Sequence, residues 1–532
     1  MYNKNQRFGI KFFILIILLF NLLFNTNAQF ESSKWIFGHG AGIDFKGGEV
    51  QSFTGSKINT IEGCSTLSNN KGDLLFYTDG ISVWNKNNAL MPNGKDLKGN
   101  ISSTQSTIII PKPGSKTIFY VFTVDSEGGK GGFTYSIVDL SKEKGLGDIT
   151  VKNEPINIHF TEKLIAVKHP NNVDIWVIVH EYESNVFLVY LLTKNGLSPQ
   201  PIISTIGMKH DKSIYNTIGY MKMSPDKKKL ALAINGNKIV QLFDFNAKDG
   251  TITNPITLKF DAKSSPYGLE FSPNSNLLYI SMVSNGFIYQ AMINDGNEQT
   301  IQKSIRLIGR NKNNRFLGAL QLGIDGRIYV AEYQSKYLSV IDNPNTIGSS
   351  CSYRAEAVTL NGGICMLGLP TFVQDFITIS NSVQKAQVTD KIMSSETNKK
   401  YILNNVYFDL NESALQKTYV SELQQLADLL NKNQKLNIEI IGHTDSTGRE
   451  HYNNKLSLAR AKAIRNYFTG KGIETSRITF SGKGSSEPVA SNKDEAGRQK
   501  NRRVELIFKA IPIIKSNTNS QLDINKQITK TR

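Results

Sequence analysis

The chain contains 532 residues, of which 39% are hydrophobic, 9% aromatic and 20% charged, and its formal net charge is +17. This length exceeds that of one ordinary domain, and the hydrophobic content excludes a chain that is disordered throughout. The positive charge is spread along the sequence without basic runs interleaved with aromatic residues, so we predict no nucleic-acid partner.

The first 28 residues have the pattern of a secretory signal peptide. A basic stretch up to Lys11 precedes an apolar core at 12–24, and small polar residues lead to Ala28. The core is shorter than the roughly 20 residues of a membrane-spanning helix, so we expect cleavage after Ala28, the alternative being an uncleaved anchor. We therefore predict an exported, periplasmic protein in an anionic cell envelope, and leave association with the outer membrane open.

From 29 to 376 the sequence consists of short β-type runs separated by turns, with almost no helical periodicity. A turn of Pro, Gly, Asn, Asp or Lys followed by an apolar strand recurs at intervals of roughly 43 to 57 residues, which suits four-stranded propeller blades. The six copies lie at 69–77, 112–122, 169–179, 224–233, 272–281 and 323–331.

We predict that 29–376 is an all-β propeller of seven blades, the fold class of the larger part of the chain. Segments 35–38 and 368–372 are expected to supply strands of one blade, because pairing of the two ends closes the ring and removes exposed strand edges. The alternative is a pair of β-sandwiches with similar turns.

This region also resembles the propeller-like N-terminal regions of secreted proteins from Bacteroidetes-type bacteria. The resemblance implies no chemistry for the region. The segments that carry it are 35–45, 62–68, 76–80, 91–94 and 102–107.

Three cysteines, Cys64, Cys351 and Cys365, permit one disulfide in an exported chain and leave one thiol over. The Cys351–Cys365 pairing closes the shortest loop, and the sequence is also compatible with the other two pairings. The cysteine spacing matches no zinc pattern, and we predict no metal and no cofactor.

Residues 377–400 are polar and rich in Ser, Lys and Gln, which is typical of a linker. Strands and helices then alternate over 401–510, and the polar tail at 511–532 is predicted to be disordered. The predicted strands lie at 403–408, 436–442, 478–481 and 503–508, and the predicted helices at 413–431 and 452–471.

Polar residues in this last region suggest a binding site. Asn453 and Arg460 lie two turns apart on one face of the second helix, and Asp445 lies in the loop before it, where ligand groups are commonly presented. A carboxylate that faces a guanidinium can hold an ammonium and a carboxylate carried by one carbon atom. The pairing suits a zwitterionic amino-acid ligand.

A string of motifs over 403–508 resembles the OmpA C-terminal family, which includes the peptidoglycan-associated lipoproteins and the flagellar stator proteins of the MotB type. The motifs are Val-Tyr-Phe-Asp (406–409), Gly-His-Thr-Asp (442–445), Asn-x-x-Leu-Ser-x-x-Arg-Ala (453–461), Gly-x-Gly (482–484), Pro488, Asn492 and Gly-Arg-x-x-Asn-Arg-Arg-Val (497–504).

The resemblance implies a small α+β domain over 401–510 that binds the meso-diaminopimelate of peptidoglycan stem peptides without a covalent bond. By position, Asp445 takes the ligand ammonium and Arg460 its carboxylate, although Arg502 alone would also fit an ordinary charge at a strand edge. The residues implied for the pocket are Asp409, Thr444, Asp445, Asn453, Arg460 and Arg502.

For the whole chain we predict a non-catalytic envelope protein that binds peptidoglycan and displays its propeller to a protein or glycan partner whose identity the sequence does not reveal. The sequence contains no His-x-x-x-His metal pair and no Gly-x-Ser-x-Gly nucleophile elbow. The alternative is a wall-anchored enzyme whose propeller acts on a polysaccharide, because a propeller can assemble a site from distant residues.

Overall fold

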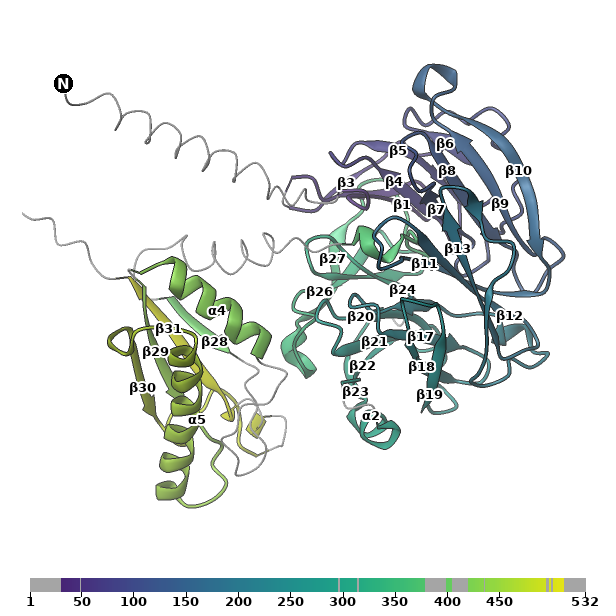
Figure 1. The fold of residues 1–532 in the computed structure, drawn as a ribbon. Coiled ribbons are helices and arrows are strands. Elements are labelled where there is room, and N and C mark those ends of the chain that lie inside the picture. Colours follow the sequence, from purple (N-terminus) through teal and green to yellow (C-terminus); the bar gives the residue numbers. More distant parts are fainter. Residues whose placement is uncertain are drawn as a thin grey trace, which may run out of the picture. The chain divides into compact units, whose positions relative to one another are not determined.

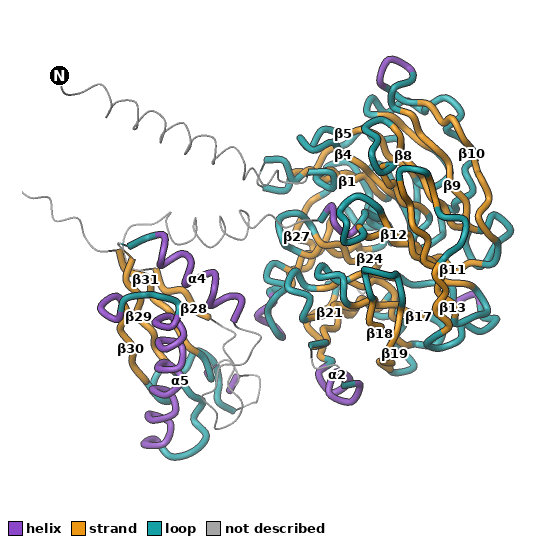
Figure 2. Tube along the Cα trace, in the orientation of Figure 1, coloured by secondary structure: helices purple, strands orange, loops and turns teal. Residues whose placement is uncertain are grey.

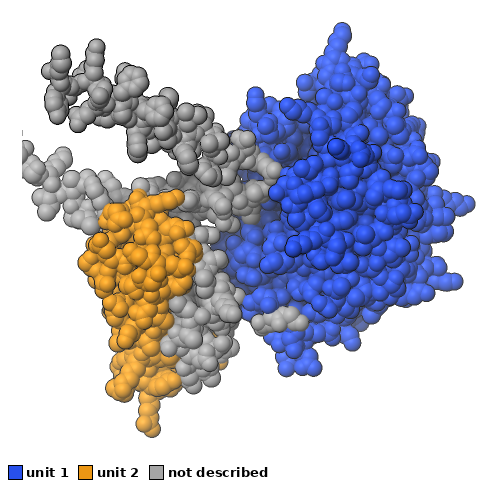
Figure 3. Space-filling view, in the orientation of Figure 1, with its two compact units in different colours: residues 1–384 blue, residues 385–532 orange. Residues whose placement is uncertain are grey.

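The computed structural model describes residues 30–377, 399–403 and 420–510, apart from gaps at 48, 295–296, 313–314, 435, 494–496 and 499–500. It divides into two compact units, Met1–Gln384 and Lys385–Arg532, which Figure 3 colours separately. The predicted signal peptide, almost all of the predicted linker and the predicted tail lie outside the described residues. Within the described residues, no helix is long and apolar enough to cross a membrane.

The described part of the first unit is built from seven small antiparallel sheets, each made of strands that follow one another in the sequence (Figures 1 and 2). The first three sheets contain β1 (Lys34–Phe37), β2 (Ala41–Asp44) and β3 (Gln51–Phe53); β4 (Ser65–Ser68), β5 (Leu74–Thr78) and β6 (Val83–Asn85); and β7 (Thr107–Pro111), β8 (Ile118–Val124), β9 (Phe133–Asp139) and β10 (Asp148–Asn157). The fourth contains β11 (Phe160–Lys168), β12 (Ile175–Glu181), β13 (Val186–Thr193), β14 (Gly196–Leu197) and β15 (Ile202–Thr205).

The remaining three sheets of this unit each contain four strands. They are β16 (Met221–Met223), β17 (Lys229–Ile234), β18 (Ile239–Phe245) and β19 (Ile252–Lys259); β20 (Pro266–Phe271), β21 (Leu277–Met282), β22 (Phe287–Met292) and β23 (Arg306–Arg310); and β24 (Leu317–Leu322), β25 (Ile328–Glu332), β26 (Tyr337–Ile341) and β27 (Tyr353–Thr359). A short helix, α2 (Glu298–Ser304), lies between β22 and β23.

The six recurring units of the sequence form equivalent parts of six sheets, because each supplies the turn between the first and second strands and then the second strand itself. The two Ser-Pro copies also share their turn chemistry. Ser224 Oγ accepts a hydrogen bond from Lys229 N at 2.9 Å, and Ser272 Oγ accepts one from Leu277 N at 2.9 Å. Such local hydrogen bonds replace ladder bonds and favour the turn.

The first strands of the seven sheets contact one another in chain order, from β1 with β4 to β20 with β24. These strands are almost wholly buried, as β11 and β20 show. The burial does not depend on apolar residues alone, because all four residues of β4 (Ser-Thr-Leu-Ser) are buried and β11 buries Glu162 and Lys163.

The C-terminal segment of the first unit forms hydrogen bonds with its N-terminal segment. Leu367 N donates to Ile61 O at 2.8 Å, and Ser32 Oγ donates to Phe376 O at 2.7 Å. The expected strand at 368–372 does not pair with β1. Pro370 instead forms a single parallel bridge with Cys64, and its missing N–H prevents it from donating to a ladder.

All three cysteines are free and buried, so the structure does not form the Cys351–Cys365 disulfide that the sequence permits. Cys351 ends a 3₁₀ turn beside Tyr279, whereas Cys365 forms a strand bridge with Ser335. The two thiols therefore belong to different local environments, and the short loop between them in sequence does not bring them together. Burial raises the pKa of the Cys351 thiol to about 11.

The described part of the second unit is a four-stranded sheet of order β28-β31-β29-β30 that shares one apolar core with two helices (Figure 2). Only β29 and β30 run parallel. Its elements are β28 (Lys399–Leu403), α4 (Val420–Lys432), β29 (Leu436–Gly442), α5 (Glu450–Gly470), β30 (Ile478–Gly482) and β31 (Val504–Ala510). The predicted strand at 436–442 is confirmed, and α5 confirms the second predicted helix to within two residues; residues 404–419 lie outside the described residues.

Candidate functional site

The predicted site lies at the carboxyl end of β29, on the side that α5 covers. His443 N donates to Arg503 O at 2.8 Å, which continues the pairing of β29 with β31, and Thr444 N donates to Gly484 O at 2.8 Å. These two backbone hydrogen bonds fix the start of the loop that carries Asp445. The side chains of Thr444 and Asp445 are buried, with 4% and 5% exposure.

Two glycines allow α5 to approach the strand ends closely. A Cβ atom on Gly442 would lie 2.0 Å from Ser457 O, and one on Gly482 would lie 2.4 Å from Leu458 N. Ser457 Oγ accepts a hydrogen bond from Gly484 N at 2.9 Å, which links the helix to the loop after β30. Gly442 and Gly482, one from each sequence motif, therefore allow the backbone of α5 to lie directly against the strand ends.

Asp445 is held by two hydrogen bonds. Its Oδ2 accepts from Arg502 Nη1 at 2.5 Å, and its Oδ1 accepts from Thr447 N at 2.8 Å. Burial alone would raise the pKa of Asp445, but the hydrogen bonds from Arg502 and Thr447 outweigh it and lower the pKa below its ordinary value. The carboxylate is therefore ionised throughout the neutral range.

Arg460 is one of the largest fully buried side chains of the chain, with 1% exposure. Its Nη1 donates to His443 O at 3.4 Å. Burial and the charge of Arg502 lower the pKa of Arg460 to about 10, against the opposing effect of Asp445. The three charges therefore lie close enough to influence one another, and Arg460 remains cationic at neutral pH.

Asn453 and Thr444 border the same charges. Asn453 Nδ2 donates to Asp445 O at 3.3 Å, so this side chain holds the loop backbone. Thr444 Oγ1 is buried and has no hydrogen-bond partner in the described part of the chain. The structure thus brings five of the six predicted residues together, whereas Asp409 lies outside the described residues.

Two asparagines that the sequence did not single out as site residues support the loop. Asn501 is fully buried, and its Oδ1 accepts from Val489 N at 2.8 Å and Ala490 N at 3.0 Å. Its Nδ2 donates to Asn492 Oδ1 at 2.9 Å, and Ser446 N donates to the same oxygen at 3.2 Å. The position of Asn501 beside Arg502 in the last motif was the signal that could have indicated this role.

A buried charged pair lies behind the site. Arg503 donates to Glu505 Oε1 from Nε at 2.9 Å and from Nη2 at 2.7 Å. His443 Nε2 lies 3.6 Å from Glu505 Oε2, and the His443 side chain is fully buried, which indicates a structural role. Arg498 donates to Asn492 O at 3.1 Å and so contacts the loop that Asn501 holds.

The arrangement can recognise a zwitterion. One carboxylate and two guanidinium groups give a net positive site that also retains an acceptor for a cation, and ionised partners make hydrogen bonds about twice as strong as neutral ones. Within the described residues, no group of three or more His, Cys, Asp or Glu side chains could hold a metal ion.

Comparison with known proteins identifies this unit. Residues 407–502 match the OmpA family model. Outer membrane porin F of Pseudomonas fluorescens is 42% identical over 106 residues, which cover 20% of this chain and 32% of that protein. The peptidoglycan-associated lipoprotein of Buchnera aphidicola is 39% identical over 107 residues, which cover 20% of this chain and 61% of that protein.

The chain thus spans less than two thirds of either relative. Among solved structures, the peptidoglycan-associated lipoprotein of Burkholderia pseudomallei is 29% identical, covers 24% of this chain and 99% of its own, and gives a TM-score of 0.20. The match to the family model covers all six of the predicted pocket residues. Residues 407–502 of the chain therefore form an OmpA family domain.

Proposed function

We propose that the OmpA family domain holds the protein to peptidoglycan by binding the meso-diaminopimelate of a stem peptide without a covalent bond. The observation that carries the proposal is the group of charges at the end of β29, in which the buried Asp445 and Arg460 lie beside the partly buried Arg502. A relative that is 39% identical over this domain is named a peptidoglycan-associated lipoprotein, which supports the same ligand class.

In this proposal Asp445 accepts hydrogen bonds from the ligand ammonium, and Arg460 binds the carboxylate on the same carbon atom. The lowered pKa of Asp445 keeps its charge available, and Arg502 holds its second oxygen in place. The unpartnered hydroxyl of Thr444 supplies a further polar contact. Asp409 completes the pocket by its position in the family motif alone.

The first unit is proposed to be a seven-bladed propeller. Three features support this: seven sheets of consecutive strands, contacts between successive first strands, and the interlocked beginning and end of the unit. A pair of sandwiches would bury the sheets face to face, and would not place each first strand against the next. The propeller is proposed to be non-catalytic and to display a surface to a protein or glycan partner.

The protein is proposed to be exported with cleavage after Ala28 and to act in the periplasm. Attachment to peptidoglycan requires exposure to that compartment, and the net charge of +17 favours an anionic envelope. The relatives named for the outer membrane agree with this location.

Pelleting of the full chain with purified peptidoglycan sacculi tests the proposal. Wild-type protein is expected to pellet, and Asp445→Asn and Arg460→Gln are expected to remain in the supernatant. Matched controls are Asp428→Asn on α4 and Lys462→Gln on α5, which change one charge each at exposed positions of the same unit. Equal pelleting of the site variants and the controls would overturn the assignment.

A further inference from the structure

The connection between β15 and β16, residues 206–220 of the first unit, is anchored by one histidine. Within 205–215, all of which the structure describes, every residue is exposed or partly exposed except His210. The side chain of His210 is fully buried, and its backbone N–H donates to Ser184 O at 2.8 Å. The inward-pointing imidazole is therefore the side chain that holds this surface segment to the fold.

The ring of His210 stacks on a second buried histidine. His180 lies in β12 and has 1% exposure. The two ring centroids are 4.1 Å apart, and the ring planes are inclined by 27°. Phe187 in β13 packs edge-on against His180 with ring centroids 4.6 Å apart. His180 and His210, termed the histidine pair, thus join the connection to the interior of the fourth sheet.

A buried cation lies near the histidine pair. Lys163 in β11 donates from Nζ to Thr217 O at 2.6 Å. Burial, followed by the charge of Lys163, lowers the pKa of His180 to about 3. Burial, followed by the charges of His180 and Lys163, lowers the pKa of His210 well below its ordinary value. Backbone contacts at Glu181 and Asn216 favour the protonated rings but are outweighed, so both rings are neutral at neutral pH.

The carboxylates nearest in sequence are engaged elsewhere or partly exposed. Glu162 in β11 accepts from Thr104 N at 2.9 Å, and Asp211 accepts from Ser213 N at 3.0 Å. Glu181, next to His180, is partly exposed. In the described part of the chain no carboxylate forms an ion pair with either ring of the histidine pair. A proton on either ring would therefore meet a second cation and no bonded anion.

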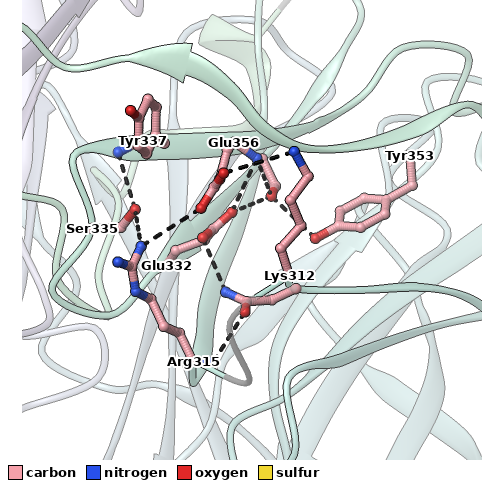
Figure 4. Close-up of polar contacts among 9 residues, drawn as sticks. Lys312, Arg315, Glu332, Ser335, Tyr337, Tyr353 and Glu356 are labelled. Atoms are coloured by element: carbon pink, nitrogen blue, oxygen red, sulfur yellow. Dashed lines mark hydrogen bonds and ion pairs between the residues drawn. The ribbon is translucent and has the colours of Figure 1, made fainter.

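Buried charges in the last sheet of the same unit are compensated (Figure 4). Glu332 has 0% exposure, and the charge of Arg315 opposes the effect of burial on its pKa. The neighbouring Glu356 lies 3.8 Å from Lys312 and 4.0 Å from Arg315. Carboxylates in that network face cations, whereas a protonated histidine pair would face Lys163.

The lowered pKa values define the pH range in which protons favour opening. A histidine that is released to water has an ordinary pKa of about 6.5, so the open form binds more protons than the closed form below that pH. Stability of the closed form is fully present above about pH 6.5 and is lost as pH falls toward the folded pKa of His180, about 3. The pKa of Lys163 is lowered to about 7, so its own effect falls above this range.

We propose that the histidine pair is an acid-sensitive latch, which holds the connection between β15 and β16 against β12 at neutral pH and releases it when the rings take up protons. The connection carries three exposed apolar side chains, Met208, Ile214 and Tyr215, and its release would also uncover Phe187. Mild acid thus enlarges an apolar surface on the first unit. The latch lies wholly in this unit and is independent of peptidoglycan binding.

Urea denaturation of the full chain at pH 7.0 and pH 5.5, followed by tryptophan fluorescence, tests the role of the histidine pair. All three tryptophans of the chain lie in the first unit, so the signal reports on that unit. The unfolding equilibrium constant of wild-type protein is expected to rise between the two pH values by roughly tenfold for each histidine of the pair. His180→Phe and His210→Phe, which keep a flat ring, should each reduce that rise by roughly tenfold. The matched control His159→Gln removes an exposed histidine of the same unit and should keep the wild-type rise.

Hydrogen–deuterium exchange locates the opening. With exchange rates normalised to the intrinsic rate at each pH, amides of 206–213 in wild-type protein are expected to lose protection about tenfold or more at pH 5.5, while β17 keeps its protection. His210→Phe should remove this pH dependence. An equal pH effect in wild-type protein and both phenylalanine variants, or a loss of protection spread evenly over the unit, would overturn the proposal. If a variant fails to fold, as judged by circular dichroism, the other variant and the exchange of wild-type protein decide the outcome.

Discussion

Arg502 Nη1 donates a hydrogen bond to Asp445 Oδ2 at 2.5 Å, although the two residues lie 57 positions apart in the chain. The sequence argument placed a guanidinium opposite Asp445 and assigned that place to Arg460. The structure gives the direct contact to Arg502, while Arg460 donates to the His443 carbonyl oxygen. Arg502 thus holds the carboxylate in position, and the proposal assigns recognition of the ligand carboxylate to Arg460.

The first prediction concerns the close approach of α5 to β29. Gly442→Ala places a Cβ atom 2.0 Å from Ser457 O, so the helix must shift. We expect a loss of about 1–3 kcal/mol in the free energy of unfolding of this domain, measured by urea denaturation. Gly470→Ala is the control, since no atom lies within 4 Å of its Cβ and alanine favours a helix; an equal loss in both variants would contradict the account.

The second prediction concerns Asn501, whose side chain holds the loop that contains Val489, Ala490 and Asn492. Asn501→Ala leaves Val489 N and Ala490 N without their acceptor, and we expect a loss of about 1–3 kcal/mol in stability together with weaker pelleting by sacculi. Asn501→Asp keeps the acceptor and should restore part of both. Asn466→Ala, at an exposed position on α5, should change neither. Normal pelleting of Asn501→Ala would show that the loop needs no such support.

The third prediction concerns the pH range of binding. The pKa of Asp445 is lowered in the folded protein, so its charge persists as pH falls through the ordinary aspartate pKa of about 3.9 and is lost only below it. The pKa of Arg460 is lowered to about 10, so carboxylate recognition should decline above that pH. Pelleting measured across this range should show both limits.

The variant Arg502→Gln tests whether protonation of Asp445 sets the lower pH limit of binding. It removes the hydrogen bond that lowers the pKa of Asp445, and burial then raises that pKa. Loss of binding should therefore begin at a higher pH in this variant. An unchanged acid limit would mean that another group controls it.

The fourth prediction concerns the cysteines. Cys64, Cys351 and Cys365 are free and buried, so native protein should react slowly with a thiol reagent and denatured protein should expose three thiols. Titration before and after unfolding in the absence of reductant measures both numbers. One reactive thiol after unfolding would instead indicate a disulfide.

The regular elements of the second unit could be predicted because their patterns are strong. Buried and partly exposed residues alternate along the whole of β29, and the buried residues of α5 recur at helical spacing. The family motifs also indicated which polar residues would gather at the site. Local pattern and family resemblance together were sufficient for these features.

Contacts between distant segments could not be predicted in the same way. Nothing local in the sequence shows that Asp445 bonds Arg502, or that Pro370 meets Cys64 and leaves β1 to pair with β2. Such contacts depend on strand placement, which the repeats indicate only in outline.

The most direct test of the central claim is calorimetric titration of the full chain with two stem tripeptides that differ only at the third residue, meso-diaminopimelate or lysine. The side chain of lysine carries an ammonium but not the carboxylate that diaminopimelate has on the same carbon atom. Asp445 is proposed to bind that ammonium and Arg460 that carboxylate. We predict about tenfold or tighter binding of the diaminopimelate peptide by wild-type protein, and loss of that preference in both Asp445→Asn and Arg460→Gln. Equal affinity of wild-type protein for the two peptides would contradict the account.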